Sequence, residues 1–222
     1  MINKLKLPGF VVLAVPLLAL AATSVRQEFA EVVSRKPDAA HGAELFAQCT
    51  ACHGADAGGV IDNSTPRIAG QHYRVLVRQL VDFRRGKRWD YRMEDVATNH
   101  DTIPEVQDIA DVAWFVSRLD RDGAREIGDG QYVERGARLY AAGCAGCHGA
   151  QGEGDDIREI PRLSGQHAAY LARQIYDAVD GRRLPLTRSH RKRFAPFAFE
   201  DVAGLTDFLA RIGWQHETTS GE

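Results

Sequence analysis

The sequence carries no surplus of charge of either sign. Its 28 Lys and Arg residues are offset by 30 Asp and Glu residues, which gives a formal net charge of −2. Binding to nucleic-acid phosphates requires an excess of basic residues over the whole domain, so this balance excludes a general nucleic-acid-binding protein. Any electrostatic recognition of a partner must depend on local patches. The composition, 44% hydrophobic and 26% charged, is that of a globular protein.

Cysteine is scarce, and its placement excludes several kinds of site. All four cysteines lie in two copies of one pentapeptide, CTACH at 49–53 and CAGCH at 144–148. The 91 residues between the two pairs are too many for a zinc ribbon, whose pairs lie about 15 to 20 residues apart. A thioredoxin-like site requires a strand before the pair, whereas the preceding residues have a helical pattern. Structural disulfides would give no reason for a histidine after each pair.

The pentapeptide CxxCH is the attachment signal for c-type haem. Two cysteines three positions apart share one face of a helical turn, so both thiols can bind the two vinyl groups on one porphyrin edge. The histidine that follows lies under the iron as the proximal ligand. We therefore predict two covalent c-type haems, held by Cys49, Cys52, Cys144 and Cys147, with His53 and His148 as proximal iron ligands.

The long apolar run of the chain lies at its N-terminus, where Lys4 and Lys6 precede residues 7–25. The basic start and the A-x-A-like pair of Ala19 and Ala21 are typical of a cleavable export signal. The run is also close to the roughly 18 to 20 residues that span a bilayer. We expect residues 1–25 to be either a signal peptide or an N-terminal membrane anchor, with the rest of the chain exported.

The chain is an internal duplication. TPRIAGQHYRVLVRQLVDFRRGKR in the first copy aligns with IPRLSGQHAAYLARQIYDAVDGRR in the second, at a register of 95 residues. Near the end the register becomes 93, so the second copy has lost two residues between Arg183 and Asp201. Apolar residues recur at helical spacing in both copies, and the charged segment 120–130 separates them. We predict an all-α fold with two small domains, 38–121 and 129–215, each around one haem.

Three further motifs recur in both copies: G-x-x-L-[FY] before CxxCH, P-R-[IL]-[AS]-G-Q-H after it, and then x-x-Q-[LI]. With these motifs, residues 39–214 resemble the dihaem class I c-type cytochromes of the cytochrome c4 type. The resemblance implies two tandem class I cytochrome c domains in pseudo-twofold contact, with their haem propionates facing each other. It also implies a respiratory electron carrier of the bacterial periplasm, soluble or anchored to the inner membrane. Its expected partners are redox proteins such as a quinol-oxidising complex and a terminal oxidase or reductase.

The resemblance also implies roles for individual residues. The carbonyls of Pro66 and Pro161 would accept a hydrogen bond from the proximal histidines, which fixes their tautomer. Glycine and aromatic residues would pack where the first and last helices of each domain cross: Gly42 and Phe46 against Phe115, and Gly136 and Tyr140 against Phe208. Four arginines are candidates to pair with haem propionates: Arg67, Arg88, Arg162 and Arg183. For each of them, a position on the surface in contact with water is an equally good interpretation.

Methionine is scarce as well, which limits the sixth iron ligands. In the family this ligand is a methionine before the last helix, and Met93 is the one methionine outside the export segment. We predict Met93 as the sixth ligand of haem 1, with His100 as a rival. A thioether ligand favours Fe(II) and raises the reduction potential.

The second copy contains no methionine. The register of 95 places Arg188 where Met93 lies in the first copy, and an arginine does not bind iron. His190 is the only histidine in that loop, so we predict His190 as the sixth ligand of haem 2. A five-coordinate iron, or a ligand from water or a partner, are the alternatives. Ligation by two histidines would give haem 2 the lower potential.

These features predict an electron carrier rather than an enzyme. Outside the haem motifs the chain shows no acid pair, no nucleophile with a base and no phosphate loop. Residues 182–193 contain six Lys or Arg and no acid, which makes a positive patch suited to an acidic partner. Two alternatives remain open. Haem 2 has an open face and binds or reduces a small ligand, or the chain is a subunit of a larger respiratory complex.

Overall fold

The computed structural model describes residues 17–60, 65–99, 101–121, 123–183 and 188–213. Within these ranges the protein is helical, and strand-like pairing is limited to two isolated bridges, Val60 with Thr65 and Asp155 with Ile160. The predicted all-α fold is confirmed.

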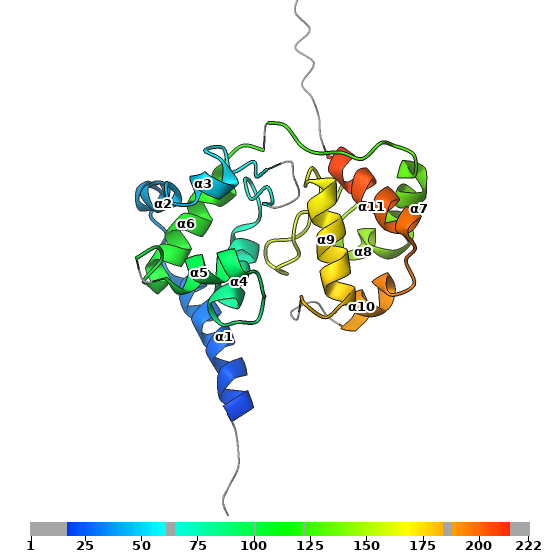
Figure 1. Cartoon of the computed structure of the whole chain (residues 1–222). Helices are drawn as coiled ribbons and strands as arrows, with labels where there is room; N and C mark the ends of the chain where they lie inside the picture. The colour runs from blue at the N-terminus through cyan, green and yellow to red at the C-terminus, as the bar shows by residue number, and fades with distance from the viewer. Residues whose placement is uncertain (1–16, 61–64, 100, 122, 184–187, 214–222) are drawn as a thin grey trace, which may run out of the picture.

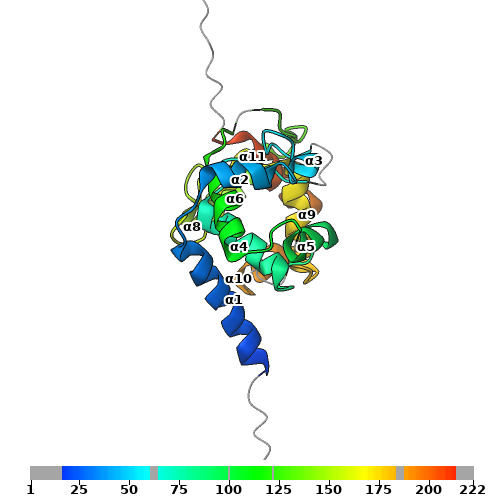
Figure 2. The ribbon, with the colours of Figure 1, turned by 90° about the vertical axis from the view of Figure 1, so that its left-hand side faces the viewer.

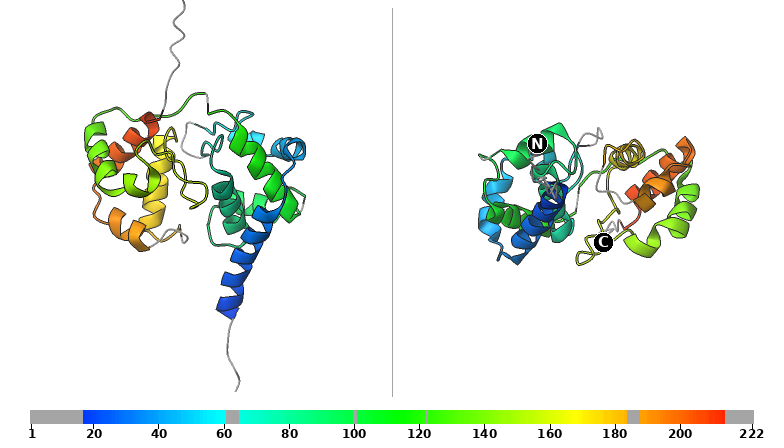
Figure 3. Two further views of the ribbon diagram at one scale, coloured as in Figure 1. Left: turned by 180° about the vertical axis from the view of Figure 1, so that it is seen from behind. Right: turned by 90° about the horizontal axis from the view of Figure 1, so that it is seen from below.

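The helices form two lobes that lie side by side (Figure 1). The first lobe contains α1 (Leu17–Ser34), α2 (Ala39–Phe46), α3 (Thr50–His53), α4 (Tyr73–Arg84), α5 (Tyr91–Thr98) and α6 (Val106–Arg118). The second contains α7 (Val133–Gly143), α8 (Ala145–His148), α9 (Ala168–Val179), α10 (Arg188–Phe194) and α11 (Phe199–Arg211). Helices α2 to α6 recur as α7 to α11, and each lobe has its own apolar core. The view from behind shows the same two units joined by one connection between α6 and α7 (Figure 3).

In each lobe the first helix of the repeat crosses the last helix at a glycine. A Cβ atom on Gly42 of α2 would lie 2.2 Å from the carbonyl oxygen of Asp111 in α6. A Cβ atom on Gly136 of α7 would lie 1.9 Å from the carbonyl oxygen of Gly204 in α11. Only a residue without a Cβ allows helices to approach this closely. Aromatic rings pack beside both crossings, with ring centres 5.6 Å apart for Phe46 and Phe115 and 5.5 Å apart for Tyr140 and Phe208.

Two glutamines hold the lobes together through reciprocal hydrogen bonds. The Gln166 side chain accepts a hydrogen bond from the backbone N–H of Arg67 (3.0 Å) and donates one to the carbonyl of the same residue (2.8 Å). Gln71 forms the same two bonds with Arg162, at 2.9 and 3.0 Å. Because the two glutamines are equivalent in the repeat, the contact between the lobes has approximate twofold symmetry.

The histidines that follow these glutamines cross the same interface. His72 Nε2 lies 2.7 Å from the carbonyl oxygen of Glu153, and His167 Nε2 lies 2.9 Å from that of Gly58. Burial lowers the pKa of His167, which favours its neutral ring. Each GQH motif is therefore an interface motif, with both of its polar side chains bonded to the backbone of the other lobe.

Helix α1 is an addition to the repeat, because residues 124–132 before α7 contain no helix. It packs on α4 and α6, buries Val25, Phe29 and Val32, and extends beyond the lobe at its N-terminal end (Figure 2). The predicted export segment, 1–25, ends inside α1, and its first 16 residues lie outside the described part of the chain. Of the helices in the described ranges, none combines the length and the apolar character needed to cross a membrane.

Candidate functional site

The first CxxCH motif forms one short helical turn. Helix α3 follows Cys49 directly, so Cys49 and Cys52 lie one turn apart. His53 is 6% exposed, and its Nδ1 lies 3.1 Å from the carbonyl oxygen of Pro66. Burial lowers the pKa of His53, so the ring is neutral. With Nδ1–H donated to Pro66, Nε2 carries the lone pair that a metal ion requires.

The second CxxCH motif has the same geometry. Helix α8 follows Cys144, and the Nδ1 of His148 lies 3.1 Å from the carbonyl oxygen of Pro161. Burial also lowers the pKa of His148. In both lobes a glycine shapes the loop that carries the proline. Gly59 (φ 80°) and Gly154 (φ 71°) have left-handed backbones, and a Cβ on either would lie within 2.5 Å of the segment at Pro66 or Pro161.

The two thiols of each motif differ in their surroundings. Burial raises the pKa of Cys49 to about 11, and it also raises the pKa of Cys144. Cys52 and Cys147 are exposed. One attachment point of each haem therefore lies at the surface of its lobe.

Met93 lies on α5, the short helix before the last helix of the first lobe. Asp90 accepts a hydrogen bond from the backbone N–H of Arg92 (3.2 Å) and so begins this helix, which places the half-buried Met93 as its third residue. The charges of Arg92 and Asp90 both act on the pKa of His53, so α5 lies close to the proximal histidine. The rival ligand, His100, lies outside the described residues.

His190 lies on α10, the short helix before the last helix of the second lobe, as Met93 lies on the corresponding helix of the first lobe. Residues 184–187, which precede α10, lie outside the described part of the chain.

The His190 ring faces the proximal histidine of its own lobe. The centres of the His148 and His190 rings lie 6.3 Å apart, and their planes make an angle of 79°. Burial lowers the pKa of His190, and the charges of Arg183 and Arg193 lower it further. The His190 ring is therefore neutral and can act as a metal ligand.

Arg67 and Arg162 lie at the contact between the lobes. The guanidinium of Arg67 donates hydrogen bonds to the carbonyls of Arg121, Gly123 and Ala124, and so holds the connection between the lobes. Burial, together with the charges of Arg162 and Arg67, lowers the pKa of Arg121 to about 9. The Nε of Arg162 is buried with no hydrogen-bond partner among the described residues. This cluster of cations fits the anionic propionates of bound haem.

Arg88 and Arg183 form a second cluster of this kind. Arg88 reaches from the first lobe to the Tyr170 hydroxyl (2.8 Å) and to Gln174 Oε1 (3.0 Å) in the second. Burial, together with the nearby charge of Arg88, lowers the pKa of Arg183 to about 10. Two guanidinium groups in one enclosed place are stabilised by an anion, so this cluster also fits haem propionates.

The basic segment of the second lobe has two parts. Arg182 pairs with Asp177 and Asp180, each at 2.8 Å, so the domain's own acids balance its charge. Residues 191–193 on α10 are exposed. Arg193 lies against Gly143, and its charge acts on the pKa of Cys144. The exposed positive charge is therefore close to the haem attachment site of this lobe.

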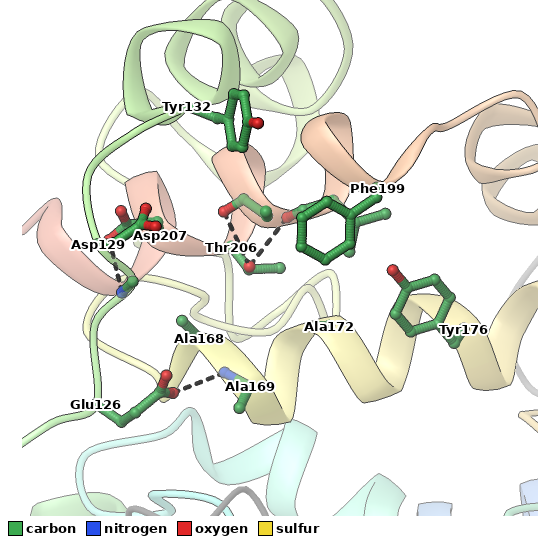
Figure 4. A pocket seen from close by; sticks show the side chains of 13 residues that line it. Glu126, Asp129, Tyr132, Ala168, Ala169, Ala172, Tyr176, Phe199, Thr206 and Asp207 are labelled. Carbon is green, nitrogen blue, oxygen red and sulfur yellow. Dashed lines mark hydrogen bonds between the residues drawn. The ribbon is translucent and has the colours of Figure 1, made fainter.

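A cavity of about 290 Å³ lies on another face of the second lobe, between α9, α11 and the connection (Figure 4). Ala169, Ala172 and Thr206 line it, and Phe199 at its edge is 68% exposed. In the repeat these residues correspond to the face of α4 and α6 that α1 covers in the first lobe. The cavity thus corresponds to the α1 contact of the first lobe, and no helix of the described part of the chain covers it.

The sequence did not predict the roles of two groups of residues at the site. Gln71 and Gln166 recur in the repeat, so their pairing with the other lobe could have been sought there. Glu28 of α1 is 5% exposed and pairs with two arginines at the end of α4, Arg84 and Arg85, but it lies beside the predicted export segment and has no counterpart in the second copy.

Comparison with known proteins agrees with this geometry. The Cytochrome c family profile matches residues 39–120 and 133–211. Cytochrome c4 of Azotobacter vinelandii is 37% identical over 189 residues, which cover 78% of this chain and 88% of the relative. A protein of Stutzerimonas stutzeri described as a thiosulfate dehydrogenase electron acceptor is 29% identical over 84% of this chain and 93% of the relative. The structure of reduced cytochrome c4 from Pseudomonas stutzeri superposes with a TM-score of 0.70 and 30% identity, over 80% of this chain and 100% of that one.

The two CxxCH turns, the repeated helical lobes and these similarities lead to one assignment. The chain carries two c-type haems, one in each lobe, attached through Cys49, Cys52, Cys144 and Cys147. It belongs to the cytochrome c family and is a dihaem electron carrier of the cytochrome c4 type.

Proposed function

We propose that this protein carries electrons in the bacterial periplasm, with His53 and Met93 as the iron ligands of haem 1 and His148 and His190 as those of haem 2. Bound haem supplies a one-electron Fe(III)/Fe(II) couple. The residues of the chain attach the two groups, fix their axial ligands and enclose them. The basic start and apolar run of residues 1–25 support export.

The observation that carries the proposal is the 6.3 Å between the ring centres of His148 and His190. An imidazole nitrogen binds a metal ion at about 2 Å, and the ring centre lies about 1 Å behind it, so two imidazoles on opposite sides of one ion have centres about 6 Å apart. The observed distance matches this arrangement. The carbonyl of Pro161 orients the first ring, and burial keeps the second ring neutral.

Met93 is proposed as the ligand of haem 1 because it lies on α5, as His190 lies on α10. Each of these is the short helix before the last helix of its lobe. A thioether stabilises Fe(II) more than an imidazole does, so haem 1 has the higher potential and haem 2 the lower. The difference gives the carrier a direction, with electrons collecting on haem 1.

The propionates of the two haems are assigned to the arginine clusters at the contact between the lobes. Arg162 contributes a buried Nε without a partner among the described residues, and Arg88 with Arg183 brings two cations together. An arginine fork matches a carboxylate in shape and charge. Arg67 takes part through its charge, since its hydrogen bonds hold the connection.

The docking partner is proposed to be an acidic redox protein. The exposed residues 191–193 lie next to the haem attachment at Cys144, so a protein that binds them lies close to haem 2. A quinol-oxidising complex as donor and a terminal oxidase or reductase as acceptor fit this role. One relative is described as a thiosulfate dehydrogenase electron acceptor, which makes an enzyme of inorganic sulfur oxidation a second class of donor.

The test is the absorption spectrum of the purified dihaem protein with and without carbon monoxide. The wild-type protein is expected to contain two low-spin haems that do not bind the gas. Met93→Ala should make haem 1 alone bind carbon monoxide, and His190→Ala should do the same for haem 2. Arg191→Gln, on the same helix as His190, is the matched control and should behave as the wild type.

The results separate the proposal from its alternatives. A high-spin haem that binds carbon monoxide in the wild-type protein would indicate an open haem 2, and with it a ligand-binding or reactive site. Two low-spin haems that persist in His190→Ala would show that another group closes the iron.

A further inference from the structure

We propose that Glu28 of α1 is a positioning residue for haem 1, because it fixes the segment of the chain that carries Met93. The Glu28 carboxylate is 5% exposed and pairs with Arg84 (3.2 Å) and Arg85 at the end of α4. A carboxylate enclosed to this extent is stable only where cations and donors hold both of its oxygens, and Arg84 and Arg85 do so.

Arg84 connects this carboxylate to the ligand segment. Its side chain is 15% exposed, and besides Glu28 it donates hydrogen bonds to the carbonyls of Ala97 (2.8 Å) and Ile103. Ala97 lies on α5, one turn after Met93, and Ile103 lies between α5 and α6. One guanidinium group thus bonds both to α5 and to the loop between α5 and α6, which follows the ligand. Glu28 holds that guanidinium in place.

Helix α1 is itself firmly seated. Val25, Phe29 and Val32 are buried on α4 and α6, and the guanidinium of Arg78 lies 3.9 Å from the centre of the Phe29 ring. The apolar contacts fix the position of α1, so Glu28 cannot move away from Arg84 without exposing them. Helix α1 is therefore part of the folded first lobe from Val25 onward, and not only the end of an export segment.

Among its described residues, the second lobe has no counterpart of these contacts. In the repeat Arg84 corresponds to Val179 and Arg85 to Asp180, and the face that α1 would cover contains the open cavity. The thioether of methionine is a weaker ligand for Fe(III) than imidazole is. The contacts of Glu28 and Arg84 are thus found in the lobe whose proposed ligand is a methionine. In this lobe a loose ligand segment would most readily let the methionine leave the iron.

This inference rests on the proposal that Met93 binds haem 1. Without Glu28, Arg84 loses its anionic partner and the carbonyls of Ala97 and Ile103 lose a fixed donor. The segment then opens more often, and the methionine leaves the iron more often. An added ligand can bind only during such openings, so its rate of binding reports them.

The experiment measures how fast imidazole displaces methionine in the oxidised dihaem protein, followed by the loss of the absorption band of the iron–methionine bond. Haem 2 has no methionine, so the band reports haem 1 alone. Glu28→Gln is expected to accelerate the displacement about tenfold, equivalent to about 1.4 kcal/mol. Arg84→Lys should do the same, because a lysine cannot reach two carbonyls and a carboxylate at once.

Glu31→Gln is the matched control, since it makes the same change on the same helix, and Glu31 pairs with Arg35 (2.5 Å) where both side chains are nearly half exposed. Its rate should stay within about threefold of the wild type. Rates in Glu28→Gln and Arg84→Lys equal to that of the wild type would overturn the inference, as would an equal acceleration in Glu31→Gln.

If the assignment of Met93 as the ligand were wrong, the variants would give a different set of results. If Met93→Ala keeps the iron–methionine band, Met93 is not the ligand and the proposed function is wrong at this point. If Met93→Ala loses the band while Glu28→Gln and Arg84→Lys behave as the wild type, only the positioning role is refuted.

Discussion

Replacing Gln166 by Leu is expected to weaken the contact between the lobes far more than replacing Gln71 by Leu, although the two residues are equivalent in the repeat. The Gln166 side chain bonds both backbone groups of Arg67 and also accepts from the N–H of His167 (3.0 Å). Arg67 is 3% exposed and His167 is 0% exposed, so water cannot replace these bonds. An unsatisfied buried polar group costs about 1 to 3 kcal/mol, so the loss of partners for these three groups gives about 3 to 9 kcal/mol for Gln166→Leu.

The bonds of Gln71 lie in a more open place. Its partners Arg162 and His72 are half-buried, so water can take over part of the lost bonding. We expect about 1 kcal/mol for Gln71→Leu. The assay is unfolding by guanidinium chloride, with the haem absorption of the two lobes as separate signals. Gln166→Leu should lower the midpoint strongly and split one transition into two. Equal effects of the two substitutions would refute the reasoning from burial.

Three further predictions concern stability and docking. A hydrogen bond to Asp111 raises the pKa of His41, so the stability that this pair contributes is complete below about pH 6.5 and is lost as the pH rises through the raised pKa. His41→Ala should therefore lower the melting temperature at about pH 5.5 and leave it unchanged at about pH 9, and an equal loss at both values would contradict this. Gly136→Ala should destabilise the second lobe by about 3 kcal/mol or more, because its Cβ would clash with the backbone of α11. Gly146→Ala should unfold at the wild-type denaturant concentration, because the equivalent residue of the first copy is Ala51. Raising the ionic strength should slow electron transfer with an acidic partner, and replacing the cations at 191–193 by Gln should remove most of that salt dependence. A salt dependence unchanged in that variant would place the docking surface elsewhere.

The parts of the structure that follow from short-range chemistry could be predicted from the sequence. The spacing of CxxCH and the following proline leads directly to His53 and Pro66, because a helical turn and one loop bring them together. The glycine positions at the helix crossings follow in the same way, since the repeat shows Gly42 and Gly136 at equivalent places.

The closeness of His190 to His148 could not be predicted from the repeat, because the register of 95 aligns Met93 with Arg188 and not with His190. The two histidine rings, with centres 6.3 Å apart, come from different helices, and only the tertiary fold brings them together.

The role of α1 could not be predicted from the sequence either. Its apolar residues continue from the export segment, and hydropathy alone does not distinguish a helix that docks on a domain from the end of a signal. The tertiary contacts of Glu28 with Arg84 and Arg85 distinguish them, and these join parts of the chain more than 50 residues apart.

The central claim is that one carrier holds two haems with different sixth ligands, Met93 and His190. Redox titration of the wild-type protein, with the two haems resolved by their spectra, tests it most directly. Two separate one-electron transitions are expected, with the iron–methionine band belonging to the haem of higher potential. A single potential shared by both haems, or the iron–methionine band on the haem of lower potential, would contradict the account.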